Sequence, residues 1–386
     1  MVKKICFLTA ARSEYGIARP LLKKLLENSN IELQVVVIGM HLSKGFGFSY
    51  KEILSDGFEI NKKIETLMDT DSVSAITKSL GLATIGCAEA FDELKPDLLL
   101  LVGDRTELLA PASAALIANI PIAHIHGGEL TSSVIDDSVR HAITKLATMH
   151  FVATEAAKKR VIQLGEHTDN VYFVGSLGVE QAEGFKPLSK SVLSARTQFK
   201  FQKQNLVVTY HPTAEEPLEI KTQMEALFSA LNAFPDIGLI FTLPNSDEKN
   251  SVIRDCISSY LRLRNNAISF ASLGTELYFS FIYHSVGVVG NSSSGLIEVP
   301  ALKRGTLNIG NRQRGRERAS SVIDCDNSCM NIISSLKILL SEDFSQALID
   351  VKNPYANKAT SESIIRAILN KDLCTKKTKT DFIDLK

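Results

Sequence analysis

The feature that most constrains this chain is a series of short apolar segments separated by longer stretches with helical spacing. Each segment is apolar throughout rather than at every second residue, which is typical of parallel strands covered on both faces. In the first half, these predicted strands are Ile5–Ala10, Leu33–Ile38, Leu98–Val102, Ile122–Ile125, His150–Ala153 and Val171–Val174. The predicted helices between them are Ile17–Leu26, Val73–Leu94, Thr106–Ala118 and Ser138–Thr148. The pattern predicts an α/β doubly wound domain.

The alternation stops between Gly175 and Gln204, where Gly, Pro, Ser and Lys predominate, and then restarts. The later predicted strands are Leu206–Thr209, Gly238–Thr242, Ala267–Phe270, Val286–Gly290 and Gly305–Ile309, and the helices Leu218–Ala233, Glu248–Arg262, Glu276–Tyr283 and Ser294–Ala301. The 386 residues also favour two domains at roughly 150 residues each. We predict Rossmann-like domains at 1–176 and 177–370, with a frayed tail at 371–386. Open α/β sheets bind ligands at the carboxyl ends of their strands, so we expect a cleft between two such edges.

Composition excludes several classes of protein. Lys and Arg number 43 and so do Asp and Glu, so no net charge favours nucleic acid or a membrane surface. No apolar stretch approaches the roughly 20 residues of a membrane span, and no export signal precedes the first strand. Six scattered cysteines then indicate reduced thiols in the cytoplasm. Cys325 and Cys329 lack nearby partner ligands, so we expect no metal.

Polar residues follow the first predicted strand, in the segment Thr9–Gly16. Small residues, a helix start and the forked donor of Arg12 would suit a phosphate or diphosphate. The segment is not a G-x-G-x-x-G loop, which argues against a nicotinamide cofactor. The alternative is that Arg12 is an ordinary surface arginine.

Asp104 and Arg105 follow the strand Leu98–Val102. Asp104 could act as an acid or base, and Arg105 could hold its pKa or contact substrate. The alternative is that Asp104 only caps the helix that follows.

The densest group of titratable residues comes after the next strand, in His124–Glu129 and Val134–His141. His126, Glu129, Asp136 and Asp137 lie there, with a Gly-Gly turn that allows close backbone approach. Clustered carboxylates raise one another's pKa, which permits acid and base chemistry near neutral pH. The alternatives are a helix cap at Asp136 or Asp137 and a core position for His124.

In the second half, His211 follows one predicted strand and the segment Gly290–Glu298 follows another. His211 could donate to a diphosphate oxygen, and Ser292, Ser293 and Ser294 form a turn suited to an anion. Glu298 would suit a ribose diol, and Arg312 is expected to face the same cleft. An ordinary loop histidine and a solvated basic loop remain the alternatives.

Taken together, these motifs resemble the UDP-N-acetylglucosamine 2-epimerase family, in its hydrolysing branch that supplies N-acetylmannosamine for sialic acid. Their order and spacing carry the resemblance across nearly the whole chain. The motifs are RSEYG (Arg12–Gly16), GMH (Gly39–His41), GDR (Gly103–Arg105), HIHGGE (His124–Glu129), DDSVRHAITK (Asp136–Lys145), GNSSSG (Gly290–Gly295) and NRQ (Asn311–Gln313).

The resemblance implies a glycosyltransferase-B-like fold and an active site between the domains. It implies that UDP is held by Arg12, His211, Ser292, Ser293, Glu298 and Arg312, and that the sugar is surrounded by Asp104, Glu129 and Asp136. Where animal bifunctional relatives have a catalytic Glu in the HIHGGE motif, this chain has His126. The expected reaction is elimination of UDP to a glycal followed by addition of water, with no metal or redox cofactor.

Four alternatives to this function remain open. The same reaction could act on UDP-2,4-diacetamido-2,4,6-trideoxyglucose, used for legionaminic acid, and a non-hydrolysing epimerase would return UDP to the glycal. A glycosyltransferase would need an acceptor, and a non-catalytic nucleotide-sugar sensor would gain little from packed carboxylates. The apolar helix Thr106–Ala118 leaves a face for a second copy, so we expect a homodimer or higher homo-oligomer.

Overall fold

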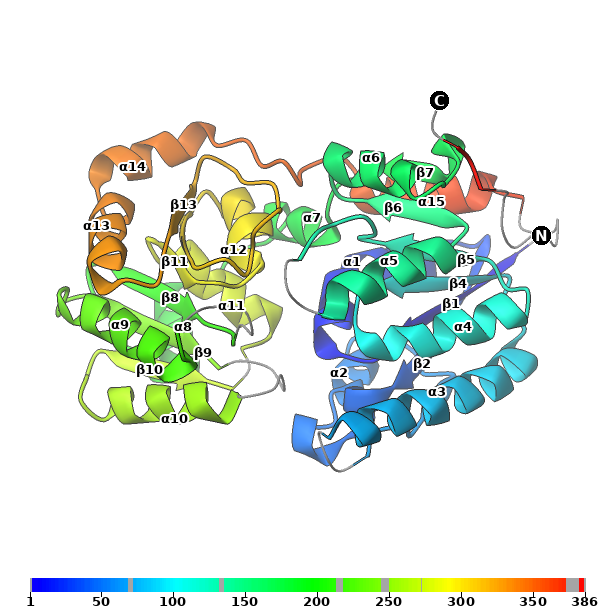
Figure 1. The fold of residues 1–386 in the computed structure, drawn as a ribbon, viewed down its shortest axis with the longest axis horizontal. Coiled ribbons are helices and arrows are strands. Elements are labelled where there is room, and N and C mark those ends of the chain that lie inside the picture. Colours follow the sequence, from blue (N-terminus) through cyan, green and yellow to red (C-terminus); the bar gives the residue numbers. More distant parts are fainter. Residues whose placement is uncertain are drawn as a thin grey trace. The chain divides into compact units, whose positions relative to one another are not determined.

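The structure is a computed structural model, and it describes residues 2–68, 72–131, 135–212, 218–243, 250–271, 273–372 and 382–384. The chain divides into two compact α/β units (Figure 1). Unit 1 comprises Met1–Glu129, Val134–Glu180 and Asn357–Lys386, and unit 2 comprises Leu130–Ser133 and Gln181–Ala356. No helix in the described part of the chain is long and apolar enough to cross a membrane.

Unit 1 is built on a parallel sheet of seven strands in the order β3-β2-β1-β4-β5-β6-β7. The strands are β1 (Lys3–Thr9), β2 (Ile31–Ile38), β3 (Lys62–Ile64), β4 (Leu98–Val102), β5 (Ile122–Ile125), β6 (Met149–Val152) and β7 (Val171–Phe173). Leu98 and Leu100 of β4 pack into one core cluster, and Leu99 and Leu101 pack into another. Both faces of the sheet are therefore covered, which explains why these strands are apolar throughout.

Helices cover both faces of this sheet (Figure 1). The main helices are α1 (Arg12–Leu26), α2 (Tyr50–Ser55), α3 (Val73–Leu94), α4 (Leu109–Ile117), α5 (Ile135–Leu146), α6 (Glu155–Gln163), α7 (Leu177–Glu183) and α15 (Thr360–Asn370). Apolar residues of α3, α4 and α5 share one cluster, and those of α1 and α15 share the other.

Unit 2 repeats this architecture with six parallel strands in the order β10-β9-β8-β11-β12-β13. The strands are β8 (Asn205–Thr209), β9 (Gly238–Thr242), β10 (Ala267–Phe270), β11 (Gly287–Gly290), β12 (Gly305–Ile309) and β13 (Val322–Cys325). The helices are α8 (Lys190–Thr197), α9 (Ile220–Asn232), α10 (Asn250–Leu261), α11 (Gly274–Tyr283), α12 (Ser294–Ile297), α13 (Cys329–Leu339) and α14 (Glu342–Ala347). The predicted fold class, α/β with two Rossmann-like domains, is confirmed. The first two residues of the predicted helix Glu248–Arg262 lie outside the described residues.

The observed division differs from the predicted 1–176 and 177–370 because α15 returns to unit 1. Ile364 and Ile368 of α15 join the core cluster that contains Leu22 of α1. The ammonium of Lys3 donates to the carbonyl oxygens of Ile368 at 2.9 Å, of Leu369 at 2.8 Å and of Lys371 at 2.6 Å. The side chain of Lys3 in β1 thus caps the end of α15.

The described residues of the tail that we predicted to be frayed make two contacts with unit 1. The amide of Ile383 donates to the carbonyl oxygen of Gly165 at 3.1 Å. The ammonium of Lys145 lies 4.9 Å from the centre of the Phe382 ring. Cys374 lies outside the described residues.

Candidate active site

In unit 1, the polar residues after β4 and β5 gather around a single buried arginine, Arg140 of α5. Its side chain is 1% exposed and donates to the carboxylate of Asp104. It also donates to the Asp137 carboxylate at 3.2 Å and to the carbonyl oxygen of Glu129 at 2.9 Å. Because β4 and β5 are neighbours in the sheet, Asp104 and Glu129 emerge at the same edge.

His126 and Glu129 form a close pair next to this arginine. The Nδ1 atom of His126 lies 2.9 Å from a carboxylate oxygen of Glu129, and the Glu129 side chain is 7% exposed. The Nε2 atom of His126 is buried and has no hydrogen-bond partner among the described residues. When a carboxylate holds one ring nitrogen of a histidine, here Nδ1, the orientation of the ring is fixed. The other nitrogen, Nε2, can then exchange a proton with a substrate.

The backbone at His126 is in an uncommon conformation. Its φ of 65° lies in the left-handed region, which non-glycine residues seldom adopt. Gly128 also has a positive φ, and a Cβ atom there would lie 2.5 Å from the carbonyl oxygen of Ala157. The glycine therefore permits the tight turn that brings Glu129 back toward His126.

His124 lies in the core, which was the alternative to a place in the acid/base cluster. It is fully buried, and its Nε2 atom lies 2.7 Å from the carbonyl oxygen of Gly103. Its Nδ1 atom lies 3.2 Å from the hydroxyl of Thr144. Burial lowers the pKa of His124 to about 4, so the ring is neutral near pH 7. This residue supports the turn that carries Asp104.

The remaining predicted residues of unit 1 have separate partners. Arg105 donates to the carboxylate of Glu107 with two bonds of 3.3 Å, so Arg140 rather than Arg105 pairs with Asp104. Arg12 lies 3.5 Å from the carboxylate of Glu52. Asp136 is half-buried in the first turn of α5.

Asp137 has a second neighbour besides Arg140. The imidazole of His141 lies 3.6 Å from the Asp137 carboxylate, one turn further along α5. Burial lowers the pKa of His141 despite this carboxylate.

Sequence reasoning missed Glu14, which is buried beneath the loop after β1. One of its carboxylate oxygens accepts bonds from the amides of Ala10 at 2.8 Å and Ala11 at 3.3 Å, and from the hydroxyl of Thr9 at 3.0 Å. The other oxygen has no hydrogen-bond partner among the described residues. Burial raises the pKa of Glu14 to about 7. A glutamate at the third position of a helix is a capping signal that the sequence offered.

In unit 2, the segments after β8, β11 and β12 meet at Asn291. Its side chain accepts from the amide of His211 at 2.7 Å and donates to the carbonyl oxygen of His211 at 2.8 Å. The guanidinium of Arg312 donates to the carbonyl oxygen of Asn291 at 3.1 Å. Burial, with a smaller effect from Arg312, lowers the pKa of His211 to about 3. A neutral His211 keeps one N–H donor.

The serine turn begins where only glycine fits. Gly290 has a φ of 134°, and a Cβ atom there would lie 1.9 Å from the carbonyl oxygen of Thr209. Ser292 and Ser293 follow, and Ser294 begins α12.

The helix after this turn is shorter than the predicted Ser294–Ala301. It ends at Ile297, and a 3-10 turn covers Val299–Leu302. Pro300 lacks the N–H that would continue the α-helical pattern. Glu298 lies between the two turns with 9% exposure. The helix dipole at the serine turn is therefore weaker than expected, and the turn itself is the stronger anion-binding feature.

Comparison with known proteins assigns the chain to a family. The family model for UDP-N-acetylglucosamine 2-epimerase matches residues 23–369. The chain belongs to that family. It is 37% identical to a Campylobacter jejuni protein named GDP/UDP-N,N'-diacetylbacillosamine 2-epimerase (hydrolyzing), over 89% of each chain. It is 36% identical to the Escherichia coli polysialic acid biosynthesis protein P7, over 100% of this chain and 98% of that protein.

The fold is similar to that of solved epimerase structures. The crystal structure of a UDP-GlcNAc 2-epimerase from Neisseria meningitidis bound to UDP-GlcNAc has a TM-score of 0.80 and 18% identity, over 95% of this chain and 100% of that one. The family and the glycosyltransferase-B-like fold that the motifs implied are thus confirmed.

Proposed function

We propose that this protein is a hydrolysing 2-epimerase that converts a UDP-linked 2-acetamido sugar and water into UDP and the free 2-epimeric sugar. The observation that carries the proposal is the grouping of Asp104, Asp137 and Glu129 around Arg140, next to the unpartnered nitrogen of His126. Moving a proton at carbon requires an acid and a base with fixed positions, and this grouping supplies both.

In this proposal, unit 2 provides the groups that bind UDP. His211, Arg312 and the backbone of Ser292, Ser293 and Ser294 stabilise the departing diphosphate. Preorganised donors of this kind contribute roughly 2.7–4 kcal/mol each to transition-state stabilisation. Glu298 accepts hydrogen bonds from the ribose diol, and Arg12 and Arg105 contribute positive charge from unit 1.

The first step is elimination of UDP. A base removes the proton on C2 while the C1–O bond to the β-phosphate breaks, and the electron pair of the C–H bond becomes the C1–C2 double bond of a glycal. His126 is our candidate base, because its free nitrogen is buried and Glu129 orients the ring. Positive charge developing at C1 is offset by Asp104 and Asp136.

The second step is hydration of the glycal. A proton is delivered to C2 on the opposite face, and a water molecule adds at C1 after giving up its own proton. Asp137, which contacts both Arg140 and His141, is our candidate for one of these transfers. The sum is consumption of one water and release of UDP, with no change of oxidation state.

Two sugars are candidates for the substrate. The names of the Campylobacter jejuni relative (GDP/UDP form) and of a Legionella pneumophila relative (UDP form) favour UDP-N,N'-diacetylbacillosamine, which is UDP-2,4-diacetamido-2,4,6-trideoxyglucose. The description of the family and the UDP-GlcNAc bound in the Neisseria meningitidis structure favour UDP-GlcNAc. The two sugars differ at C4 and C6, so both fit the same chemistry at C1 and C2.

The test is incubation with each nucleotide sugar separately, followed by identification of all products. We expect UDP and a free 2-epimeric sugar, with a higher kcat/KM for one of the two substrates. A UDP-linked epimer would instead indicate the non-hydrolysing reaction. Binding of both nucleotide sugars without turnover would indicate a sensor and contradict the proposal.

A further inference from the structure

Unit 2 contains a cavity at the edge of its sheet opposite to His211 and Arg312. It has a volume of about 390 Å³ and lies where β8, β11 and β12 begin, lined by Asn205, Val286 and Arg304 among others. The candidate UDP-binding residues follow the carboxyl ends of the same three strands. The cavity and the candidate UDP site are therefore separated by the length of the sheet.

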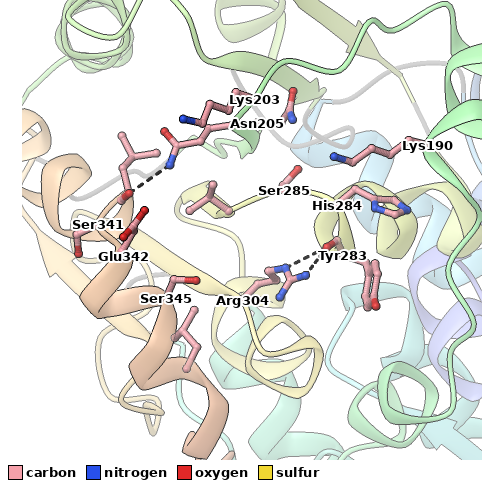
Figure 2. Close-up of a pocket in the computed structure, with 14 residues that line it drawn as sticks. Lys190, Lys203, Asn205, Tyr283, His284, Ser285, Arg304, Ser341, Glu342 and Ser345 are labelled. Carbon is pink, nitrogen blue, oxygen red and sulfur yellow. Dashed lines mark hydrogen bonds between the residues drawn. The ribbon is translucent and has the colours of Figure 1, made fainter.

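The charged side chains of this cavity are mostly cationic. Lys190, Lys203 and Arg304 line it, against the single carboxylate of Glu342 (Figure 2). Among the residues that the structure describes, the ammonium groups of Lys190 and Lys203 form no ion pair or hydrogen bond, although that of Lys190 lies 5.5 Å from the centre of the Phe201 ring. Figure 2 shows Lys190 extending over Ser285 toward the interior of the pocket.

Arg304 has unused hydrogen-bonding capacity. Its guanidinium donates to the carbonyl oxygen of Tyr283 at 3.0 and 2.6 Å and to that of Lys303 at 3.0 Å. A guanidinium carries five N–H groups, so two remain without an acceptor within the described ranges. Partial burial lowers the pKa of Arg304, which means that its charge is incompletely solvated.

The segments that carry these cations are anchored. The side chain of Asn205 accepts a hydrogen bond from the backbone amide of Gln202 at 2.9 Å and donates one to the backbone carbonyl oxygen of Gln202 at 3.0 Å. These two bonds fix the turn that carries Lys203. The imidazole of His284 lies 2.7 Å from the carbonyl oxygen of Leu188, just before Lys190. Fixed backbones reduce the entropy that a ligand must overcome on binding.

We propose that this pocket binds a small metabolite that carries a phosphate monoester or a carboxylate. Its anionic group would accept from the free N–H groups of Arg304 and neutralise Lys190 and Lys203. The cavity volume falls within the range of small-molecule sites, about 300–1,000 Å³. The exposed ring of Tyr283, with Arg304 stacked 5.2 Å from its centre, provides an apolar wall for the rest of the ligand.

The test measures anion binding by titration calorimetry at low salt, using inorganic phosphate, ribose 5-phosphate and gluconate, with neutral ribose as the control ligand. All titrations use an Arg312→Ala background, which disables the proposed UDP site, in the full-length chain. The key variant is Lys190→Met/Lys203→Met, because both lysines are exposed and a methionine at 190 can keep the apolar part of the contact with Phe201. Lys200→Met, an exposed lysine of the same segment outside the cavity, is the matched control.

We expect saturable binding of at least one anion but not of ribose. The double variant should weaken it at least tenfold, while Lys200→Met should leave it unchanged. Comparison of ribose 5-phosphate with gluconate then tells whether phosphate or carboxylate is preferred. Absence of saturable anion binding, equal binding of ribose, or affinity within twofold of the parent in the double variant would overturn the proposal. None of these results bears on epimerase turnover.

Discussion

The side chain of Arg140 is 1% exposed, and its acceptors include two carboxylates and a carbonyl oxygen. Replacing it by Met leaves the Glu129 carbonyl and the Asp104 carboxylate without their donor. We expect Arg140→Met to lower the free energy of unfolding by about 1–3 kcal/mol and to abolish turnover. Urea denaturation and a turnover assay measure both, with the exposed Lys159→Met as control. A variant as stable as wild type would show that Arg140 does not organise the site.

His126 tests the proposed base directly. His126→Asn removes the ring nitrogen that exchanges the proton, so we expect kcat to fall about 10²–10⁴-fold with little change in KM. The matched control is His167→Asn, since His167 is a surface histidine with 45% side-chain exposure. If His126→Asn kept wild-type kcat, another residue would have to move the C2 proton.

Glu14 gives a pH-dependent prediction. Its folded pKa of about 7 lies above the ordinary value of 4.5, so its contribution to stability is present below pH 4.5 and is lost as pH rises through 7. Gln does not titrate, and its amide can replace the protonated carboxyl. We therefore expect Glu14→Gln to gain stability relative to wild type between pH 5 and pH 8.5, by on the order of 3 kcal/mol at most. Histidine titrations occur in both proteins and cancel in the difference. If the difference in free energy of unfolding between Glu14→Gln and wild type were the same at pH 5 and at pH 8.5, the raised pKa of Glu14 would be contradicted.

At this scale the sequence predicted residue types better than their partners. Asp104, Glu129 and Asp137 were predicted as members of one acid/base run, and Arg140 does donate to the carboxylates of Asp104 and Asp137 and to the backbone carbonyl of Glu129. The partner itself, Arg140, could not be identified, since it is 36 residues away from Asp104 in sequence. For Arg105 the sequence left two roles open, holding the pKa of Asp104 or contacting substrate, and the structure pairs Arg105 with Glu107.

At the level of elements, the junction of β1 with α15 offers a matched pair of lysines. Lys3 donates to three carbonyl oxygens at the end of α15, whereas Lys4 has a distant surface partner in Glu32 at 3.9 Å. We expect Lys3→Met to lower the free energy of unfolding by about 1–2 kcal/mol and Lys4→Met to change it by less than about 1 kcal/mol. Thermal unfolding of both variants measures the contrast, and equal effects would mean that α15 does not depend on this contact.

Strands were predicted more completely than helices because burial on both faces leaves an uninterrupted apolar signal. Leu98–Val102 and Ile122–Ile125 match β4 and β5 to the residue. The short edge strand β3 was missed, since two of its three residues are lysines. The edge strand β13 and the helix α15 were not predicted either, so the return of α15 to unit 1 was also missed.

At the scale of the whole molecule, we propose that the two Rossmann-like units together form an enzyme that breaks a C1–O bond and inverts the configuration at C2. Family membership is established by the match over residues 23–369. Hydrolysis, the roles of individual residues and the identity of the sugar are what the proposal adds. Release of a free 2-epimeric sugar by elimination depends on proton transfer at C2, so uptake of solvent deuterium at that carbon tests this step.

The most direct measurement is the reaction in deuterium oxide, with UDP-GlcNAc and UDP-2,4-diacetamido-2,4,6-trideoxyglucose as substrates and NMR analysis of the products. We predict UDP and a free sugar of inverted configuration at C2, with one deuterium at that carbon from the solvent. A released sugar that keeps its original C2 configuration and proton would contradict the account, because hydrolysis would then have occurred without proton transfer at C2.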